Sequence, residues 1–263
     1  MTTTVAPLSP PLKWAGGKRW LLPVLQQLWR RHRHRRLVEP FCGGLSVALG
    51  LQPSEALLND VNNALINFYQ QLQQGLTVSI PFNNEEEQYY RYRRWFNELN
   101  MANDAPQHSA QLFYYLNRTG YNGLCRFNQS GKYNVPFGRY KTIRYQQDFL
   151  AYQTLLQPWQ FTDCDFEQLK VSEEDFIYAD PPYDVPFQQY AQQGFNWEDQ
   201  ERLALWLAQH KGPVVISNQA TTRIKRLYKQ LGFQYRLIDA PRRISCKGNG
   251  RQTAKEVLIK RGI

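Results

Sequence analysis

Several features that mark particular protein classes are missing from this 263-residue sequence. No stretch reaches the roughly 18 consecutive apolar residues of a membrane span, and the first residues contain no hydrophobic signal-peptide core. There is also no complete G-x-G-x-x-G and no Gly-Lys-Ser/Thr loop, which argues against a dinucleotide enzyme and a P-loop NTPase. We therefore expect a soluble cytoplasmic protein outside those two enzyme classes.

Cysteine is also scarce. The sequence has no CxxC pair and no histidine cluster beside its four widely separated cysteines, which are Cys42, Cys125, Cys164 and Cys246. Metal sites and disulfide frameworks need closely spaced ligands or a conserved pairing pattern. We therefore expect reduced thiols and no bound metal.

Acidic residues are outnumbered by basic ones, 22 to 32, which gives a formal net charge of +10. An excess of this size favours a polyanionic partner, and nucleic acid is the first to consider. The alternative is that the charge only keeps the protein soluble. The 16 tyrosines and 7 tryptophans can either fill a core or stack on bases. The basic run from Arg30 to Arg36 is interpreted as the solvated end of a helix.

The hydrophobic pattern predicts an α/β protein. Helical segments are expected near 20–30, directly after Gly44, and near 61–72, 85–99, 107–116, 197–210 and 221–231. Strands are expected near 37–39, 55–59, 175–179, 213–217, 233–239 and 255–260. Strands that alternate with helices indicate a mostly parallel sheet covered on both faces, with ligands at the carboxyl ends of the strands.

The texture of the sequence changes between residues 76 and 145. This part is aromatic and mainly helical, and it ends in a Gly/Asn/Tyr-rich stretch with hairpin signals and a turn at Ser130-Gly131. We therefore predict an insertion over 76–145 in a core formed by 1–75 and 146–263.

The strongest local signal is Asp180-Pro181-Pro182-Tyr183, which directly follows the apolar strand Phe176–Ala179. Two prolines end the strand because they have no backbone N–H to donate. The rigid turn would present the Asp180 carboxylate, the Pro181 carbonyl and the Tyr183 ring, which suits an amino group bound under an aromatic face. The alternative is an ordinary turn with a local aspartate cap.

A second signal is the turn Glu39-Pro40-Phe41-Cys42-Gly43-Gly44 after a short strand, with Asp60 at the end of the next strand. Glycines let a ligand approach the backbone, and an acidic side chain on the second strand suits ribose hydroxyls. Such turns are common in α/β proteins, so this one is weak evidence by itself.

Four motifs occur in a characteristic order: Lys13–Lys18 (KWAGGK), Glu39–Gly44, Tyr121–Tyr140 and Asp180–Tyr183. Over residues 8–261 the chain resembles the Dam-type (D12 class) adenine-N6 DNA methyltransferases. The resemblance implies a Rossmann-like S-adenosylmethionine-dependent methyltransferase core with an inserted target-recognition domain that carries a β-hairpin. One departure is Leu45, where many relatives have a further glycine.

The resemblance also assigns roles to residues of this chain. Those expected to contact or shape the pocket for S-adenosylmethionine are Trp14, Lys18, Glu39, Phe41, Gly43, Asp60, Asp165, Phe166 and Asp180. Asp165 and Phe166 would hold the adenine of that cofactor. Asp180, Pro181, Pro182 and Tyr183 would form the catalytic turn, with Tyr183 stacked on a flipped target base.

The same resemblance implies a duplex-DNA interface and the target GATC. The residues expected to contact DNA are Lys13, Tyr121, Asn122, Leu124, Arg126, Pro136, Arg139, Tyr140, Arg242 and Arg243. Arg126 would bind O6 and N7 of the outer guanine, or else only a phosphate. The loop 241–255, with Arg242 and Arg243, would grip phosphates, the alternative being a solvated basic loop.

Three rival functions remain at this point. A cytosine-N4 methyltransferase uses a similar turn, an RNA methyltransferase would suit the charge and the aromatic residues, and a non-catalytic DNA-binding regulator would explain the basic hairpin. Asp at the first position of the turn and the Dam-like hairpin favour adenine in double-stranded DNA. We expect the protein to act as a monomer.

Overall fold

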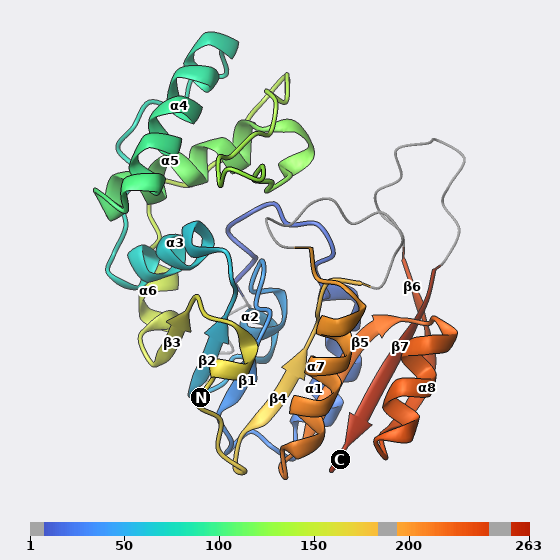
Figure 1. The fold of residues 1–263 in the computed structure, drawn as a ribbon. Coiled ribbons are helices and arrows are strands. Elements are labelled where there is room, and N and C mark those ends of the chain that lie inside the picture. The colour runs from blue at the N-terminus through green and yellow to red at the C-terminus, as the bar shows by residue number, and fades with distance from the viewer. Residues whose placement is uncertain (1–7, 184–193, 242–253) are drawn as a thin grey trace.

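The computed structural model describes residues 8–183, 194–241 and 254–263. Its centre is a seven-stranded sheet with the order β3-β2-β1-β4-β5-β7-β6 (Figure 1). The strands are β1 (Leu37–Glu39), β2 (Ala56–Asn59), β3 (Trp159–Thr162), β4 (Phe176–Ala179), β5 (Val214–Gln219), β6 (Gln234–Ala240) and β7 (Ala254–Arg261). The five strands from β3 to β5 are parallel, whereas β7 runs antiparallel to β5 and β6.

Helices cover both faces of the sheet, because the central parallel strands are buried on both sides. The helices are α1 (Leu22–Trp29), α2 (Ser46–Leu51), α3 (Asn63–Gln73), α4 (Glu86–Ala102), α5 (Pro106–Thr119), α6 (Leu150–Leu156), α7 (Trp197–Gln209) and α8 (Thr222–Gln230). Side chains of α1, α2 and α3 share one apolar cluster with Tyr178 and Val215. Those of α7 and α8 share another with Ile177 and Ile216, the alternate residues of the same strands. The predicted α/β class, with a mostly parallel sheet, is therefore confirmed.

Two elements were not predicted, namely α6 and β3. β3 is an edge strand that buries only alternate residues, and α6 buries only Tyr152 and Leu156, so neither has a strong apolar pattern. Glutamines of α3 cover this edge: Gln73 Nε2 donates to the carbonyl of Trp159 at 2.7 Å, and Gln70 Nε2 donates to that of Phe161 at 3.4 Å.

Residues 76–145 contain α4, α5, a short 3₁₀ turn (Tyr121–Gly123) and the hairpin. Figure 1 shows α4 and α5 beyond the end of the sheet toward which β2 and β4 point. In the hairpin, Phe127 bridges to Tyr133, and the Gly131 amide donates to the Asn128 carbonyl at 2.9 Å. The predicted turn at Ser130-Gly131 is thus present. The apolar packing continues without a break from α3 into α5, and the division into 1–75 with 146–263 and 76–145 stays a prediction.

The basic run does not behave as one unit. Arg30, Arg31 and Arg33 are exposed, as interpreted from the sequence. Arg36 instead donates from Nη2 at 2.7 Å to the buried carboxylate of Asp175, so for this residue the interpretation was wrong. In the described part of the chain, no helix is long and apolar enough to cross a membrane.

Candidate active site

The candidate site lies where the carboxyl ends of β1, β2, β4 and β5 meet. Each of these parallel strands carries polar residues at or just after its carboxyl end: the Glu39–Gly44 turn for β1, Asp60 for β2, Asp180–Tyr183 for β4, and Ser217 within the last residues of β5. Neighbouring parallel strands end at the same edge of a sheet, so the topology alone brings these segments together. The predicted catalytic and cofactor-binding turns are therefore adjacent.

Asp180 is held through one of its two carboxylate oxygens. Lys18 Nζ lies 3.0 Å from Oδ1, and the Ser217 hydroxyl donates to the same atom at 2.8 Å. No hydrogen bond or ion pair among the described residues reaches Oδ2. Burial raises the pKa of Asp180, and Lys18 and Ser217 counteract that rise because they stabilise the carboxylate. The carboxylate thus keeps one free oxygen.

Lys18 connects three parts of the site. Its side chain is only 6% exposed, and its ammonium donates to the Gly16 carbonyl at 3.1 Å as well as pairing with Asp180. The same nitrogen lies 4.7 Å from the centre of the Tyr183 ring, within the range of a cation–π contact. Lys18 therefore fixes the aspartate and the tyrosine of the turn relative to each other.

The far end of the turn is held by a buried amide pair. Gln200 Nε2 on α7 donates to the Pro182 carbonyl at 2.8 Å, and Asn218 Nδ2 on β5 donates to Gln200 Oε1 at 3.0 Å. Gln200 is 1% exposed and Asn218 is fully buried. The position of the turn is therefore set from α7 as well as from β5.

The Tyr183 hydroxyl is buried opposite the Glu256 carboxyl of β7. Burial, followed by the nearby carboxylates of Asp180 and Glu256, raises the pKa of Tyr183. Neither the hydroxyl nor Glu256 Oε2 makes a hydrogen bond of good geometry with the described residues. Tyr183 thus presents a neutral ring to the site.

The glycine turn after β1 packs directly on Trp14. A Cβ on Gly43 would lie 2.7 Å from Trp14 Nε1, and one on Gly44 would lie 2.6 Å from Trp14 Cβ. Gly43 also has a positive φ of 44°, which only glycine adopts without strain. The predicted pocket wall formed by Trp14 and Gly43 is consequently contiguous.

Leu45, the residue that departs from the family pattern, also has a positive φ, 57°. It is the N-cap of α2 and fully buried. A left-handed conformation costs a non-glycine residue roughly 1–2 kcal/mol, which the burial of the leucine side chain offsets. The turn therefore keeps the backbone that a glycine would favour.

Asp60 binds the same turn from the neighbouring strand. Its Oδ2 accepts the Gly43 amide at 3.1 Å, and its Oδ1 accepts the Asn62 amide at 3.1 Å. Burial raises the pKa of Asp60 to about 6 despite these two donors. Each oxygen still has acceptor capacity for a ligand hydroxyl.

Glu39 is 2% exposed, and its Oε1 has no hydrogen-bond partner among the described residues. Burial, with the Asp180 carboxylate as a second cause, raises the pKa of Glu39 well above its usual value. Burying a carboxyl oxygen without a hydrogen-bond partner costs folding free energy, because the lost contacts with water are not replaced. Its position at the carboxyl end of β1 suits a ligand that donates hydrogen bonds or carries positive charge.

Asp165 and Phe166 lie on the other side of the glycine turn. The Phe166 ring is 5.8 Å from that of Phe41. Asp165 Oδ1 accepts the Glu167 amide at 3.0 Å and pairs with Arg202 Nη2 at 2.9 Å. As for Asp180, the protein engages Oδ1, and no bond among the described residues reaches Oδ2.

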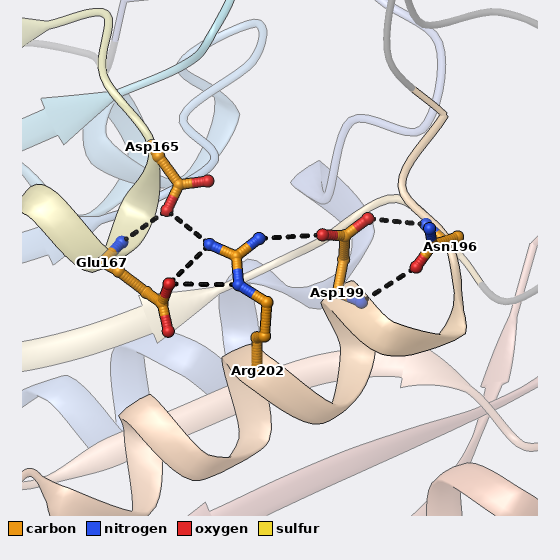
Figure 2. Close-up of polar contacts among 5 residues, drawn as sticks. All are labelled: Asp165, Glu167, Asn196, Asp199 and Arg202. Atoms are coloured by element: carbon orange, nitrogen blue, oxygen red, sulfur yellow. Dashed lines mark hydrogen bonds and ion pairs between the residues drawn. The ribbon is translucent and has the colours of Figure 1, made fainter.

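Arg202 of α7 links Asp165 to the helix that also carries Gln200. Figure 2 shows its guanidinium between Asp165 and Glu167 on one side and Asp199 on the other. Asn196 and Asp199 form a capping box at the start of α7, which fixes where the helix begins. A single helix thus supports the Asp180–Tyr183 turn and the carboxylate expected to bind the cofactor.

Lys13 lies where the N-terminal segment meets α5. Its amide donates to Asn117 Oδ1 of α5 and its carbonyl accepts Asn117 Nδ2, both at 2.8 Å. Its ammonium donates to the Arg118 carbonyl at 2.9 Å and lies 3.8 Å from the centre of the Tyr140 ring. Burial, and after it the charge of Arg118, lowers the pKa of Lys13 to about 8.

Arg126 is tied to its own hairpin. Its Nε donates to Asn134 Oδ1 at 2.7 Å, and its Nη2 donates to the Asn134 carbonyl at 3.2 Å. Arg139 is exposed and pairs with Glu86 at 2.8 Å. The remaining predicted DNA contacts in this region range from half-buried to exposed; they are Tyr121, Asn122, Leu124, Pro136 and Tyr140. Arg242 and Arg243 lie outside the described residues.

Four supporting residues were missed by the sequence analysis, namely Gln200, Arg202, Ser217 and Asn218. Ser217 and Asn218 follow the apolar residues of a predicted strand next to the catalytic one, a place where polar residues meet ligands. That signal was available. The roles of Gln200 and Arg202 depend on how α7 is rotated, which no motif indicates. No group of three or more His, Cys, Asp or Glu side chains in the described ranges is arranged to hold a metal ion.

Comparison with known proteins decides the family. Residues 14–244 match the family model described as D12 class N6 adenine-specific DNA methyltransferase. The chain belongs to this family. Its activity is accordingly the methylation of adenine N6 in DNA, and the cytosine-N4 and non-catalytic alternatives are set aside.

Curated relatives agree with the family match. The chain is 37% identical over 269 residues to a DNA adenine methylase of Vibrio cholerae serotype O1, with 94% of each chain covered. It is 34% identical over 268 residues to the DNA adenine methylase of Escherichia coli K12, covering 94% of this chain and 93% of that one. A DNA N-6-adenine-methyltransferase of Escherichia phage P1 is 38% identical over 265 residues, although the match spans only 34% of the phage protein.

The matches to solved structures include two proteins that are each 10% identical to this chain. A putative RNA methyltransferase from Pyrococcus horikoshii matches with 10% identity and a TM-score of 0.43, covering 95% of this chain and 84% of that one. A likeness of that size does not bear on function.

Proposed function

We propose that this chain transfers the methyl group of S-adenosylmethionine to adenine N6 in the duplex sequence GATC, acting as a monomer on a base flipped out of the helix. The observation that carries the proposal is the state of Asp180. Its Oδ1 is engaged by Lys18 and Ser217, so Oδ2 remains for a donor, next to the carbonyl of Pro181 and the ring of Tyr183.

The residues around the glycine turn fit this cofactor. S-adenosylmethionine carries a positive sulfonium and an ammonium group, and the site supplies the partnerless Glu39 oxygen and the carboxylates of Asp60 and Asp165. The close packing of Trp14 on Gly43 leaves no space for a side chain on that wall. When bound, the cofactor would supply an electrophilic methyl group, so the protein's task is orientation and charge placement.

The protein residues act on the target amine. The N6 lone pair of adenine is delocalised into the ring, which makes it a poor nucleophile. Hydrogen bonds from the amine to Asp180 Oδ2 and the Pro181 carbonyl would localise that lone pair. Lys18 keeps Asp180 ionised until the nitrogen becomes positively charged, and Asp180, whose pKa burial raises, can then accept the proton that N6 loses.

The hairpin residues suit recognition of GATC in duplex DNA. Arg126 can donate two hydrogen bonds to O6 and N7 of the outer guanine, and Lys13 can reach the first guanine. Leu124 and Pro136 offer apolar surface to the thymine methyl group. Tyr121, 49% exposed, would occupy with Asn122 the gap left by the flipped base.

A product assay tests the proposal. The protein is incubated with labelled S-adenosylmethionine and mixed-sequence DNA, and the methylated nucleoside and its sequence context are determined. We expect N6-methyladenine confined to GATC. Label on cytosine would overturn the proposed chemistry, whereas equal methylation after the outer G·C pair is changed would overturn the target sequence alone.

A further inference from the structure

We propose that Ser217 and Asn218, consecutive residues of β5, position the Asp180–Tyr183 turn for methyl transfer. They act from opposite faces of the sheet, Ser217 through Asp180 and Asn218 through Gln200. The inference rests on the proposed function, in which Asp180 and Pro181 receive the target amine. None of these residues needs to touch the substrate, so they are positioning residues.

The Ser217 branch is a directed chain of hydroxyl groups. Ser217 has one hydroxyl proton, and its geometry gives that proton to Asp180 Oδ1 at 2.8 Å. The Tyr178 hydroxyl lies 2.8 Å from the same Ser217 oxygen, so Tyr178 must be the donor in that pair. Burial raises the pKa of Tyr178 well above its usual value, which keeps this donor protonated. Both residues are at most 1% exposed.

This chain determines which oxygen of Asp180 is free. The terminal torsion of an aspartate is broad and restrains its carboxylate only weakly. With two donors on Oδ1, from Lys18 and Ser217, the carboxylate plane is fixed and Oδ2 is left for the amine. Without Ser217, Lys18 alone holds Oδ1, and the carboxylate can rotate about that single contact.

The Asn218 branch holds the other end of the turn. Pro181 and Pro182 have no backbone N–H, so the turn cannot be anchored by its own donors there. The turn is held instead through an acceptor, the Pro182 carbonyl, to which Gln200 Nε2 donates at 2.8 Å. Asn218 fixes the orientation of the Gln200 amide by donating to Oε1, because an amide turned over would face Pro182 with an oxygen.

The Ser217 branch also affects the charge of Asp180. The charged or titratable groups that face Asp180 are Lys18, Glu39, Tyr178, Tyr183 and Glu256. Lys18 and the Ser217 hydroxyl lower the pKa of Asp180, against the effect of burial. Removing the hydroxyl should therefore raise that pKa and move the acid limb of the rate profile to higher pH. A purely structural role would not move it.

The test measures single-turnover methylation of mixed-sequence DNA at saturating S-adenosylmethionine, per cofactor-binding site. For Ser217→Ala we expect a rate about tenfold lower, an acid limb at higher pH, and cofactor affinity within twofold of wild type. Ser217→Thr, which keeps the hydroxyl, should recover most of the rate. Tyr178→Phe should lower the rate about threefold and also move the acid limb to higher pH. Gln200→Met should lower the rate about tenfold.

Tyr228→Phe is the matched control. Tyr228 of α8 is fully buried, and its hydroxyl has no hydrogen-bond partner among the described residues. Removing that hydroxyl deletes the same atom as Tyr178→Phe without touching the turn, so the rate should be unchanged.

The outcomes separate this inference from the proposed function. Rates within twofold of wild type and an unmoved acid limb for Ser217→Ala and Tyr178→Phe would overturn the Ser217 branch. An unchanged rate for Gln200→Met would overturn the Asn218 branch. If Ser217→Ala does not fold, Tyr178→Phe decides. If the wild type transfers no methyl group, or Asp180→Ala is fully active, the proposed function itself fails.

Discussion

The Asp180–Tyr183 turn and the hairpin around Arg126 carry the polar groups on which the proposed reaction depends, but the protein holds them differently. The turn is anchored by buried donors that leave one carboxylate oxygen over. The hairpin engages Arg126 with Asn134, and Lys13 donates to a backbone carbonyl of α5. The turn therefore leaves one carboxylate oxygen without a bond to the described residues, whereas Arg126 and Lys13 both bind groups of the protein.

The two regions differ in whether a ligand must break protein contacts in order to bind. A target amine can add to Asp180 without breaking a protein contact, which is what preorganisation for catalysis requires. In the proposed recognition of GATC, cognate DNA would instead exchange the bonds of Arg126 and Lys13 for bonds to bases. A wrong base offers no replacement and leaves a donor unpaired, so this exchange favours selectivity over raw affinity.

The largest effect should follow Asp180→Ala, which removes the carboxylate that the turn holds ready for the target amine. Loss of a contact made in the transition state costs on the order of 10²–10³ in rate. DNA affinity should stay within a few-fold, because Asp180 is not among the residues proposed to contact DNA phosphates. Single-turnover methylation and a DNA-binding titration check this, and near-normal turnover would contradict the assigned role.

Arg126→Ala should have the next largest effect, on selectivity. A good bidentate pair discriminates by roughly 1–3 kcal/mol, or about 5- to 150-fold. Methylation rates on duplexes with and without the outer G·C pair should converge, while non-specific affinity persists. Arg94→Ala, an exposed arginine on α4, serves as control and should leave the ratio unchanged.

Lys13 should make the affinity for cognate duplex DNA depend on pH. Its pKa is lowered to about 8 by burial, so the ammonium is charged at pH 7 and largely neutral at pH 9. The charged fraction falls about tenfold between these pH values, so affinity for cognate duplex should fall by up to about tenfold. Lys13→Met should remove that difference, and a wild-type affinity independent of pH would argue against a base contact by this residue.

The smallest effect is expected for Arg202→Ala, which removes an exposed ion pair to Asp165 rather than a buried hydrogen bond. The Arg202 side chain is 40% exposed, and such ion pairs contribute less than about 1 kcal/mol. The dissociation constant for S-adenosylmethionine should rise about threefold, since Asp165 loses its fixed orientation. Arg226→Ala on α8, also exposed, should not change it.

The sequence predicted the framework of the fold because apolar strands and their turns are local features. Phe176–Ala179 with the two prolines after it defines both a buried strand and its end. The edge strand β3 and helix α6 escaped because partly exposed elements have weak patterns. Arg36 was misinterpreted because its partner Asp175 lies 139 residues away.

The candidate site was likewise predictable only in part. Motif residues such as Asp180 and Gly43 could be named because their chemistry depends on residue type at fixed spacing. Ser217 could have been named, because it follows the apolar residues of a predicted strand next to Asp180. Gln200 and Arg202 could not, since each acts on a distant part of the chain in a way that depends on how α7 is rotated. The pairing of Arg126 with Asn134 likewise depends on hairpin geometry, and the motif gives only the residue.

The segment from Lys13 to Lys18 has a further consequence. Its first residue is fixed to α5, its second packs on the glycine turn, and its last pairs with Asp180. If DNA displaces Lys13 as proposed, the displacement would move the segment 13–18 and with it the residues proposed to bind the cofactor. Thermodynamic reciprocity then requires that bound cofactor alter the affinity for cognate duplex by the same factor by which that duplex alters the affinity for cofactor.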